Sequence, residues 1–297
     1  MHDDEVPLSH HDAISMIRRQ FPEFANEPIA ACNAVGTTNY VFQIGEHYAA
    51  RFPRRLTHPD ICLETLCSEA DAMTDLNRHC SVRTPTPYAI GTPSDAYPMP
   101  WSIQSWITGE IATPHGQASC ASFTQDLANL ILSLRSADTQ GRPFCGQGRG
   151  GHLSDHDGWM EHCFSQSETL LNVPHLRQTW SSLRTLPDPG SLVMCHKDLI
   201  PENVLIADDR LVGVLDGGGF GPADPALDLV ASWHMLETQN RDTFRQYLGC
   251  DDIEWLRGAA WAFQQAMGLV WYYQRSNPDL CALGRSTLNR LSQNVSL

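Results

Sequence analysis

The chain has 297 residues, 42% of them hydrophobic, and a formal net charge of −14 at pH 7. This composition can bury one large core or two lobes, which excludes a disordered chain, and the negative charge argues against a nucleic-acid partner because phosphates would be repelled. The sequence has no apolar run of about 18 residues and starts with an acidic segment, so we expect a cytoplasmic protein without a membrane segment.

The first predicted elements form a β-hairpin. Residues 39–44 and 47–52 are strand-like segments joined by a turn at Gly45, and Arg51 lies near the end of the second strand. A short polar turn precedes the hairpin and contains Gly36, Thr37, Thr38 and Asn39. With one glycine it resembles an ordinary turn, and only its position before the hairpin that contains Arg51 indicates a functional role.

The next predicted elements are a helix, a strand and a second helix. The helical pattern begins at Glu69 and continues to residue 76, with its apolar side against the sheet. Residues 101–107 alternate as a strand, and residues 123–134 place apolar side chains on one helix face. The polar, glycine-rich residues 138–151 predict a surface loop.

Further helices are predicted at residues 154–171 and 178–183. The first of them contains Asp155, Asp157 and Glu161, which could bind a cationic substrate. Each of these residues also fits an ordinary acidic residue in the first turn of a helix or on its solvent side.

The pattern with the most chemical content places Asp198 five residues before Asn203 and ends at Asp216. Two apolar segments at 204–206 and 211–215 predict a hairpin that brings Asn203 and Asp216 to one metal site. Phosphoryl transfer needs a carboxylate that orients the acceptor hydroxyl and oxygen ligands that hold Mg²⁺. Asp198 is therefore the predicted catalytic base, and Asn203 and Asp216 are the predicted Mg²⁺ ligands.

These motif segments resemble the aminoglycoside phosphotransferase family of small-molecule kinases, which share the protein-kinase fold. The segments are residues 196–203, 214–218 and 221–229. The tail segments 255–262 and 271–273, with Asn277 and Pro278, resemble a bacterial branch of that family. The resemblance implies an α+β, two-lobed fold. Its N-lobe, residues 1–106, would hold an antiparallel sheet with an αC-like helix, and its mainly helical C-lobe, residues 107–297, would hold the catalytic loop and acceptor pocket.

The resemblance also implies how the phosphates are bound. Kinases usually carry a lysine on the strand of Arg51, but Lys197 is the only lysine in the chain. Arg51 would therefore bind the phosphates, since a guanidinium offers parallel hydrogen bonds to phosphate, and Glu69 would fix it, with Glu64 as a less favoured partner.

Other nucleotide contacts are implied by position. The turn that contains Gly36, Thr37, Thr38 and Asn39 would cover the phosphates, mainly through backbone N–H groups. Backbone groups around Gln104, Ser105 and Trp106 would bind the purine, which leaves ATP and GTP as alternatives.

Two further residues of the motif segments are expected to act on the catalytic loop. Asp228 would stabilise it through backbone hydrogen bonds. Lys197 replaces the glycine that the family usually has at this position; it projects into solvent in the interpretation we favour, and otherwise lies near the transferred phosphoryl group.

Together these features predict a Mg²⁺-dependent O-phosphotransferase that moves the γ-phosphoryl group of ATP or GTP to a hydroxyl of an aminoglycoside-like antibiotic. Only five residues separate Gly218 from Asp224, too few for the activation segment of a protein kinase. The alternatives are a metabolic kinase of the choline, sugar or homoserine type and a nucleotide-binding protein without turnover. A monomer and a dimer are both compatible with the sequence.

Overall fold

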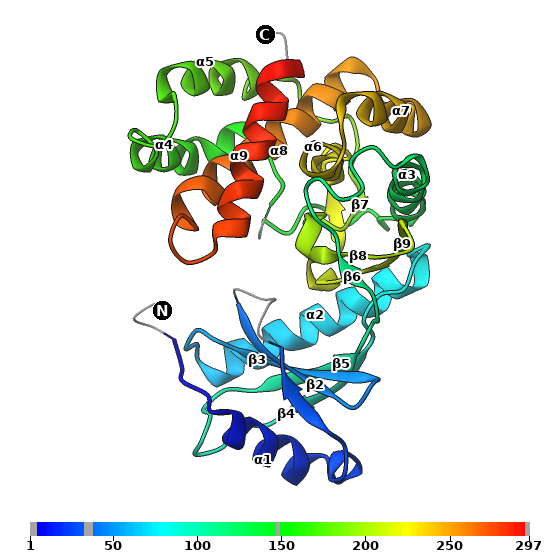
Figure 1. Cartoon of the computed structure of the whole chain (residues 1–297), viewed down its shortest axis with the longest axis vertical. Helices are drawn as coiled ribbons and strands as arrows, with labels where there is room; N and C mark the ends of the chain where they lie inside the picture. Colours follow the sequence, from blue (N-terminus) through cyan, green and yellow to red (C-terminus); the bar gives the residue numbers. More distant parts are fainter. Residues whose placement is uncertain (1–4, 33–37, 147–148, 295–297) are drawn as a thin grey trace. The chain divides into compact units, whose positions relative to one another are not determined.

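The computed structural model describes residues 5–32, 38–146 and 149–294 and divides into two units (Figure 1). The first comprises Met1–Arg78, Arg83–Thr108 and Val214–Gly218. The second comprises His79–Val82, Gly109–Gly213 and Gly219–Leu297. The sequence suggested a single division after residue 106, whereas the first unit also takes in a short segment from late in the chain.

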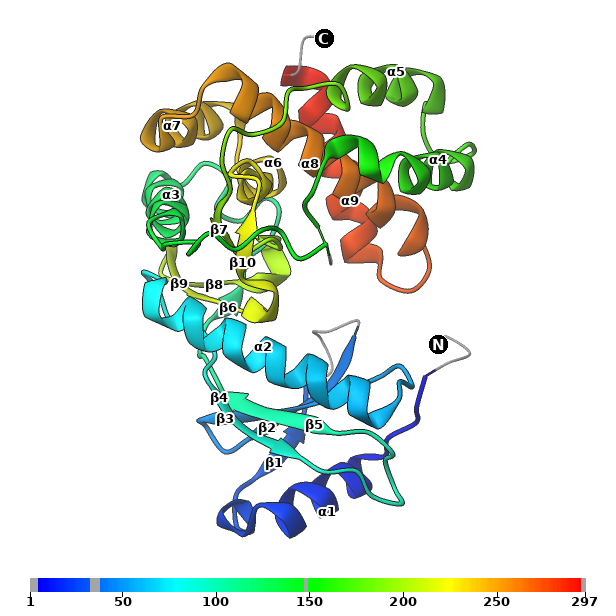
Figure 2. The ribbon, with the colours of Figure 1, turned by 180° about the vertical axis from the view of Figure 1, so that it is seen from behind.

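The first unit is built on a five-stranded antiparallel sheet of order β1-β2-β3-β5-β4. Its strands are β1 (Ile29–Ala31), β2 (Asn39–Ile44), β3 (Tyr48–Pro53), β4 (Pro87–Gly91) and β5 (Trp101–Ser105). The predicted hairpin is confirmed, since β2 and β3 pair from Asn39–Pro53 to Ile44–Tyr48 around the turn at Gly45. Helices α1 (His10–Gln20) and α2 (Pro59–His79) lie on opposite sides of this sheet, and η1 (Pro22–Phe24) follows α1 (Figures 1 and 2).

Alternation along the strands divides their side chains between the α1 side and the α2 side of this sheet. Phe52, Trp101 and Ile103 are buried in a core cluster that includes Met16 and Ile17 of α1. Because neighbouring side chains of a strand point to opposite faces, the residues between them face α2. Arg51 of β3 and Gln104 of β5 are therefore on the α2 side, where a polar site is possible.

Helix α2 begins ten residues before the predicted start at Glu69, so that prediction was wrong. Its first residue is Pro59, whose fixed φ suits the first turn of a helix, and the Asp60 backbone N–H donates to His58 Nδ1 at 3.4 Å. Cys62 and Leu66 of its first half are buried, as are Met73 and Leu76 further along. Glu69 thus lies in the middle of a long helix, which fixes its height above the sheet.

The second unit is mainly helical. Its helices are α3 (Ala121–Arg135), η2 (Leu153–His156), α4 (Asp157–Gln166), α5 (Val173–Leu183), η3 (Pro201–Asn203), η5 (Leu227–Leu229), α6 (Val230–Met235), α7 (Thr238–Leu248), α8 (Asp252–Tyr272) and α9 (Pro278–Asn294). The helix predicted at 123–134 is confirmed, whereas 154–171 forms η2 and a shorter α4. No helix in the described ranges is long and apolar enough to cross a membrane.

Two small antiparallel sheets support the catalytic motif. One pairs β7 (Val193–Cys195) with β10 (Gly221–Ala223), and the other has the order β6-β8-β9, formed by β6 (Glu110–Ile111), β8 (Val204–Ala207) and β9 (Arg210–Val214). The motif residues 196–203 connect β7 to β8. The predicted strands on either side of the turn after Ala207 are thus confirmed.

The segment Val214–Gly218, which includes most of η4 (Gly217–Gly219), is tied to the first unit by close contacts. The Val214 backbone N–H donates to Arg83 O at 2.9 Å. A Cβ at Gly217 would lie 2.2 Å from Leu76 Cδ2, so only glycine lets α2 pack this closely. These contacts place Asp216 beside the sheet of the first unit.

A buried ion pair holds the chain after β10. Asp224 Oδ2 accepts hydrogen bonds from Arg257 Nε at 2.9 Å and from Trp261 Nε1 at 2.7 Å, both on α8. Asp224 and Arg257 are 2% and 1% exposed. Removing one partner would leave a buried charge uncompensated, at a cost of about 3–5 kcal/mol, so the pair fixes the segment that leads to Asp228.

Candidate active site

The loop of the second unit that was predicted to be catalytic holds Asp198 and Asn203 together. Asn203 Nδ2 donates to the backbone oxygen of Asp198 at 2.9 Å and to its Oδ2 at 3.1 Å. The amide nitrogen is thereby used, and no described residue donates to Asn203 Oδ1. An amide oxygen is a ligand that Mg²⁺ accepts, so the donor set fits the predicted role of Asn203.

Asp228 fixes the start of the same loop. Its Oδ2 accepts from the His196 backbone N–H and its Oδ1 from that of Lys197, each at 2.8 Å. The carboxyl is 1% exposed, and burial raises its pKa, while the charge of His196 and the two backbone bonds act in the opposite direction. The expected backbone hydrogen bonds of Asp228 are confirmed.

Lys197 adopts a backbone conformation that favours glycine. Its φ is +73°, in the left-handed region that L-residues with a Cβ populate at a cost. This explains in physical terms why glycine suits the position. The side chain does not simply project into solvent as we expected, because Nζ lies 5.6 Å from the centre of the Phe144 ring and beside Gly221.

Sequence reasoning missed one residue of this loop region. Arg149, which lies within the glycine-rich stretch 138–151 between α3 and η2, donates through Nη1 to Asp198 Oδ1. The two side chains are 33% and 30% exposed. The stretch had been assigned only as a surface loop, and no local pattern marks a contact across 49 residues.

In the first unit, Arg51 lies between β5 and the segment that carries Asp216. Its Nη2 donates to Asp216 Oδ1 at 2.9 Å and its Nη1 to Gln104 Oε1 at 3.4 Å. The Arg51 side chain is 14% exposed and that of Asp216 is 48% exposed. Asp216 therefore keeps an accessible carboxylate, which suits a metal ligand.

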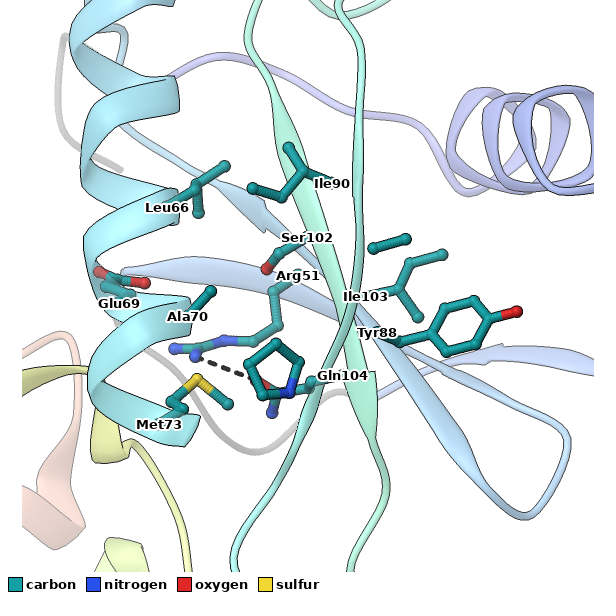
Figure 3. Close-up of a pocket in the computed structure, with 12 residues that line it drawn as sticks. Arg51, Leu66, Glu69, Ala70, Met73, Tyr88, Ile90, Ser102, Ile103 and Gln104 are labelled. Carbon is teal, nitrogen blue, oxygen red and sulfur yellow. Dashed lines mark hydrogen bonds between the residues drawn. The ribbon is translucent and has the colours of Figure 1, made fainter. Parts of the chain in front are cut away.

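The predicted ion pair between Arg51 and Glu69 is not present in the described part of the chain. Both residues line a cavity of about 190 Å³ between α2, β4 and β5 (Figure 3), but the guanidinium bonds to Asp216 and Gln104 instead. Burial raises the pKa of the Glu69 carboxyl, the charge of Arg51 lowers it, and that of Asp216 raises it further. Glu64, the alternative partner, is exposed on the same helix.

Some residues of the turn that was predicted to cover the phosphates lie outside the described residues. Gly36 and Thr37 fall there, whereas Asn39 Nδ2 donates to Thr38 Oγ1 at 3.1 Å just before the hairpin. The roles of these four residues stay predictions.

The segment predicted to bind the purine has its backbone donors occupied. The Ser105 N–H donates to Thr86 O at 2.9 Å and the Trp106 N–H to His47 O at 2.7 Å. Purine contacts at these two residues would therefore use carbonyl oxygens. Gln104 takes part through its side chain, by accepting from Arg51.

The acidic residues suggested for a cationic acceptor mostly have partners within the protein. Asp157 accepts from Arg184 Nε at 2.7 Å and from Trp180 Nε1 at 3.0 Å. Glu161 pairs with Arg177 at 2.7 Å, and Asp155 accepts from a backbone N–H at the start of η2. They act as structural residues, as the alternative interpretation held, because each stabilises a helix start or a contact between helices.

Comparison with known proteins defines the fold class and then the family. The fold is that of the two-lobed protein-kinase-like phosphotransferases: the GDP and kanamycin complex of APH(2")-IIia superimposes with a TM-score of 0.73, at 20% identity, over 96% of this chain and 99% of the other. Macrolide 2'-phosphotransferase MphH from Brachybacterium faecium gives 0.64, at 17% identity, over 94% and 97%. Residues 33–261 match the model of the Phosphotransferase enzyme family (APH), so the chain belongs to that family.

Two curated relatives match over short segments. An aminoglycoside 3'-phosphotransferase of Streptomyces fradiae is 43% identical over 56 residues, which is 18% of this chain and 21% of that protein. The match thus spans about a fifth of the relative's length, and it supports the family without carrying the whole activity.

Proposed function

We propose that this protein is a Mg²⁺-dependent kinase that transfers the γ-phosphoryl group of ATP or GTP to a hydroxyl of an aminoglycoside-like molecule. The family match, joined to a catalytic loop in which Asn203 and Asp228 fix Asp198, is the observation that carries the proposal. The similarity to an enzyme with bound GDP and kanamycin supports the nucleotide and the acceptor class.

In the proposed reaction, Asp198 accepts a hydrogen bond from the acceptor hydroxyl and orients its oxygen toward the γ-phosphorus. A new P–O bond forms, the bond between the γ-phosphorus and the β,γ-bridging oxygen breaks, and its electron pair stays with the nucleoside diphosphate. The hydroxyl proton passes to Asp198 and then to solvent. Arg51 binds phosphate oxygens in the first unit, where its guanidinium is already oriented by Gln104.

The proposed metal ligands are Asn203 and Asp216. Asn203 Oδ1 and Asp216 are hard oxygen donors, and Mg²⁺ bound by them would neutralise phosphate charge.

The acceptor class is tested with a panel and labelled nucleotide. Kanamycin is expected to be phosphorylated in the presence of Mg²⁺ and not in the presence of a chelator. A macrolide belongs in the panel because the MphH structure has a similar fold, and choline, a sugar and homoserine represent the metabolic kinases. Transfer to the macrolide, choline, the sugar or homoserine but not to kanamycin would refute the aminoglycoside assignment. No transfer to any acceptor would contradict a kinase function.

A further inference from the structure

The contact between Arg149 and Asp198 is the strongest feature of the second unit that the proposed reaction does not use. Arg149 Nη1 donates to Asp198 Oδ1, while Asn203 Nδ2 donates to Asp198 Oδ2 at 3.1 Å. A carboxylate has about four acceptor positions on its two oxygens, so these two contacts leave room for an acceptor hydroxyl. Arg149 can therefore remain in place while Asp198 orients the substrate.

The turn that carries Arg149 is specified by its neighbours. A Cβ at Gly150 would lie 2.5 Å from Phe144 Cε2, and φ at Gly150 is +141°, so only glycine fits between Arg149 and the ring. The same ring contacts Lys197, next to Asp198 in the sequence. Phe144 thus connects the turn to the catalytic loop.

The other side of this turn is attached to α8. His156 Nε2 donates to Gly150 O at 3.0 Å, and its Nδ1 accepts from Gln264 Nε2 at 3.4 Å. The His156 ring also meets the edge of Trp261 with centroids 5.1 Å apart. Since the backbone next to Arg149 is held at two places, its guanidinium has a defined position at Asp198.

That position matters for the transfer step. The acceptor oxygen must lie within hydrogen-bond reach of Asp198 and about 3–3.5 Å from the γ-phosphorus. A guanidinium on the same carboxylate is then within reach of the phosphoryl oxygens, on which charge is spread in the loose transition state. An arginine is suited to this because it is always charged and has five donors in a rigid plane.

From this geometry we infer that Arg149 is a catalytic residue that contacts the transferred phosphoryl group in the transition state and stabilises its charge there. The inference rests on the proposed kinase function. Arg149 and Asp198 both belong to the second unit, so the inference rests on a contact within that unit. The atoms and electrons move as in the reaction above, and Arg149 stays protonated throughout.

The test compares Arg149→Ala, Arg149→Lys and the parent protein with the best acceptor of the panel. We expect Arg149→Ala to lower kcat about 10²–10³-fold, with both KM values within about threefold, because the lost contact forms only in the transition state. Arg149→Lys should retain part of the rate, since the charge remains without the planar donors. Added guanidinium salt should restore Arg149→Ala several-fold, which a purely structural role would not permit.

Arg210→Ala is the matched control, since Arg210 pairs with Asp126 at 2.6 Å on the surface of the same unit. Thermal unfolding of each variant shows whether the fold is intact. Unchanged kcat in Arg149→Ala, a rise in acceptor KM alone, or a loss that guanidinium does not restore in a folded variant would each overturn the inference and leave the kinase function standing. A parent protein that transfers no phosphate would overturn both.

Discussion

Arg51 and Asp216 are 165 positions apart in the sequence and are joined by a hydrogen bond of 2.9 Å between Nη2 and Oδ1. The bond connects the residue proposed to bind phosphate with a residue proposed to bind Mg²⁺. Because this ion pair joins them, the arginine proposed to bind phosphate and the aspartate proposed to bind the metal should be positioned together. Neither Glu69 nor Glu64 is needed to hold the guanidinium.

Replacement of Arg51 tests its role at the nucleotide. Arg51→Met should raise the nucleotide KM about 10–100-fold, because hydrogen bonds to charged groups contribute about 1.5–3 kcal/mol. The nucleotide KM of Arg51→Lys should lie between those of the parent and Arg51→Met, since lysine keeps the charge and loses the parallel donors. Steady-state kinetics with nucleotide as the varied substrate gives the answer, with Arg18→Ala, an exposed arginine of α1, as control. An unchanged KM would remove Arg51 from the nucleotide site.

Replacement of Asp198 tests the base. Asp198→Asn should lower kcat about 10²–10⁴-fold, because the amide cannot take the hydroxyl proton, while nucleotide affinity stays within about threefold. Affinity is measured by calorimetry and kcat with labelled nucleotide. The control is Asp208→Asn in the exposed turn after β8, where φ is +50° and asparagine is tolerated. Full activity of Asp198→Asn would refute the assignment.

Stability should depend on pH through Glu69. Because burial raises the pKa of this carboxyl above its ordinary value, protonation favours the folded state. This contribution is complete below the unfolded pKa and is lost as the pH rises through the folded pKa. Glu69→Gln, which stays neutral, should therefore raise the free energy of unfolding relative to the parent, and more at about pH 8 than at about pH 5.

Urea unfolding at the two pH values measures that difference. Glu64→Gln is the matched control, since Glu64 is an exposed glutamate of the same helix. If Glu69→Gln destabilises the protein at the higher pH, the carboxylate is stabilised by a partner such as Arg51, and desolvation is not the dominant effect.

The positive φ of Lys197 predicts an unusual order of stability. Lys197→Gly and Lys197→Ala both lose the contact with Phe144, so their difference isolates the backbone. The glycine variant should be more stable by about 0.5–1 kcal/mol, since the left-handed strain of alanine exceeds the extra entropy of unfolded glycine. At Asp71, an exposed position in the middle of α2, alanine should instead be the more stable by about 1 kcal/mol. If the alanine variant is the more stable at both positions, the backbone at Lys197 is not strained.

The sequence by itself determined the local features. Strand 39–44 has the predicted bounds, because alternation with period two is a local property. Asp198 and Asn203 are bonded because five residues of one tight loop separate them. The helical pattern was identified only from Glu69, and the start of α2 at Pro59, ten residues earlier, was therefore missed.

The tertiary structure decided which residues meet across long stretches of chain. Arg149 contacts Asp198, and Arg51 contacts Asp216. Asp157 accepts a hydrogen bond from Arg184 and is therefore no longer a candidate for binding the acceptor. No local pattern encodes such pairs, because they depend on how packed helices and strands place side chains that are tens of residues apart. Residue types and spacing are therefore enough to identify the chemistry, and packing assigns each charge its partner.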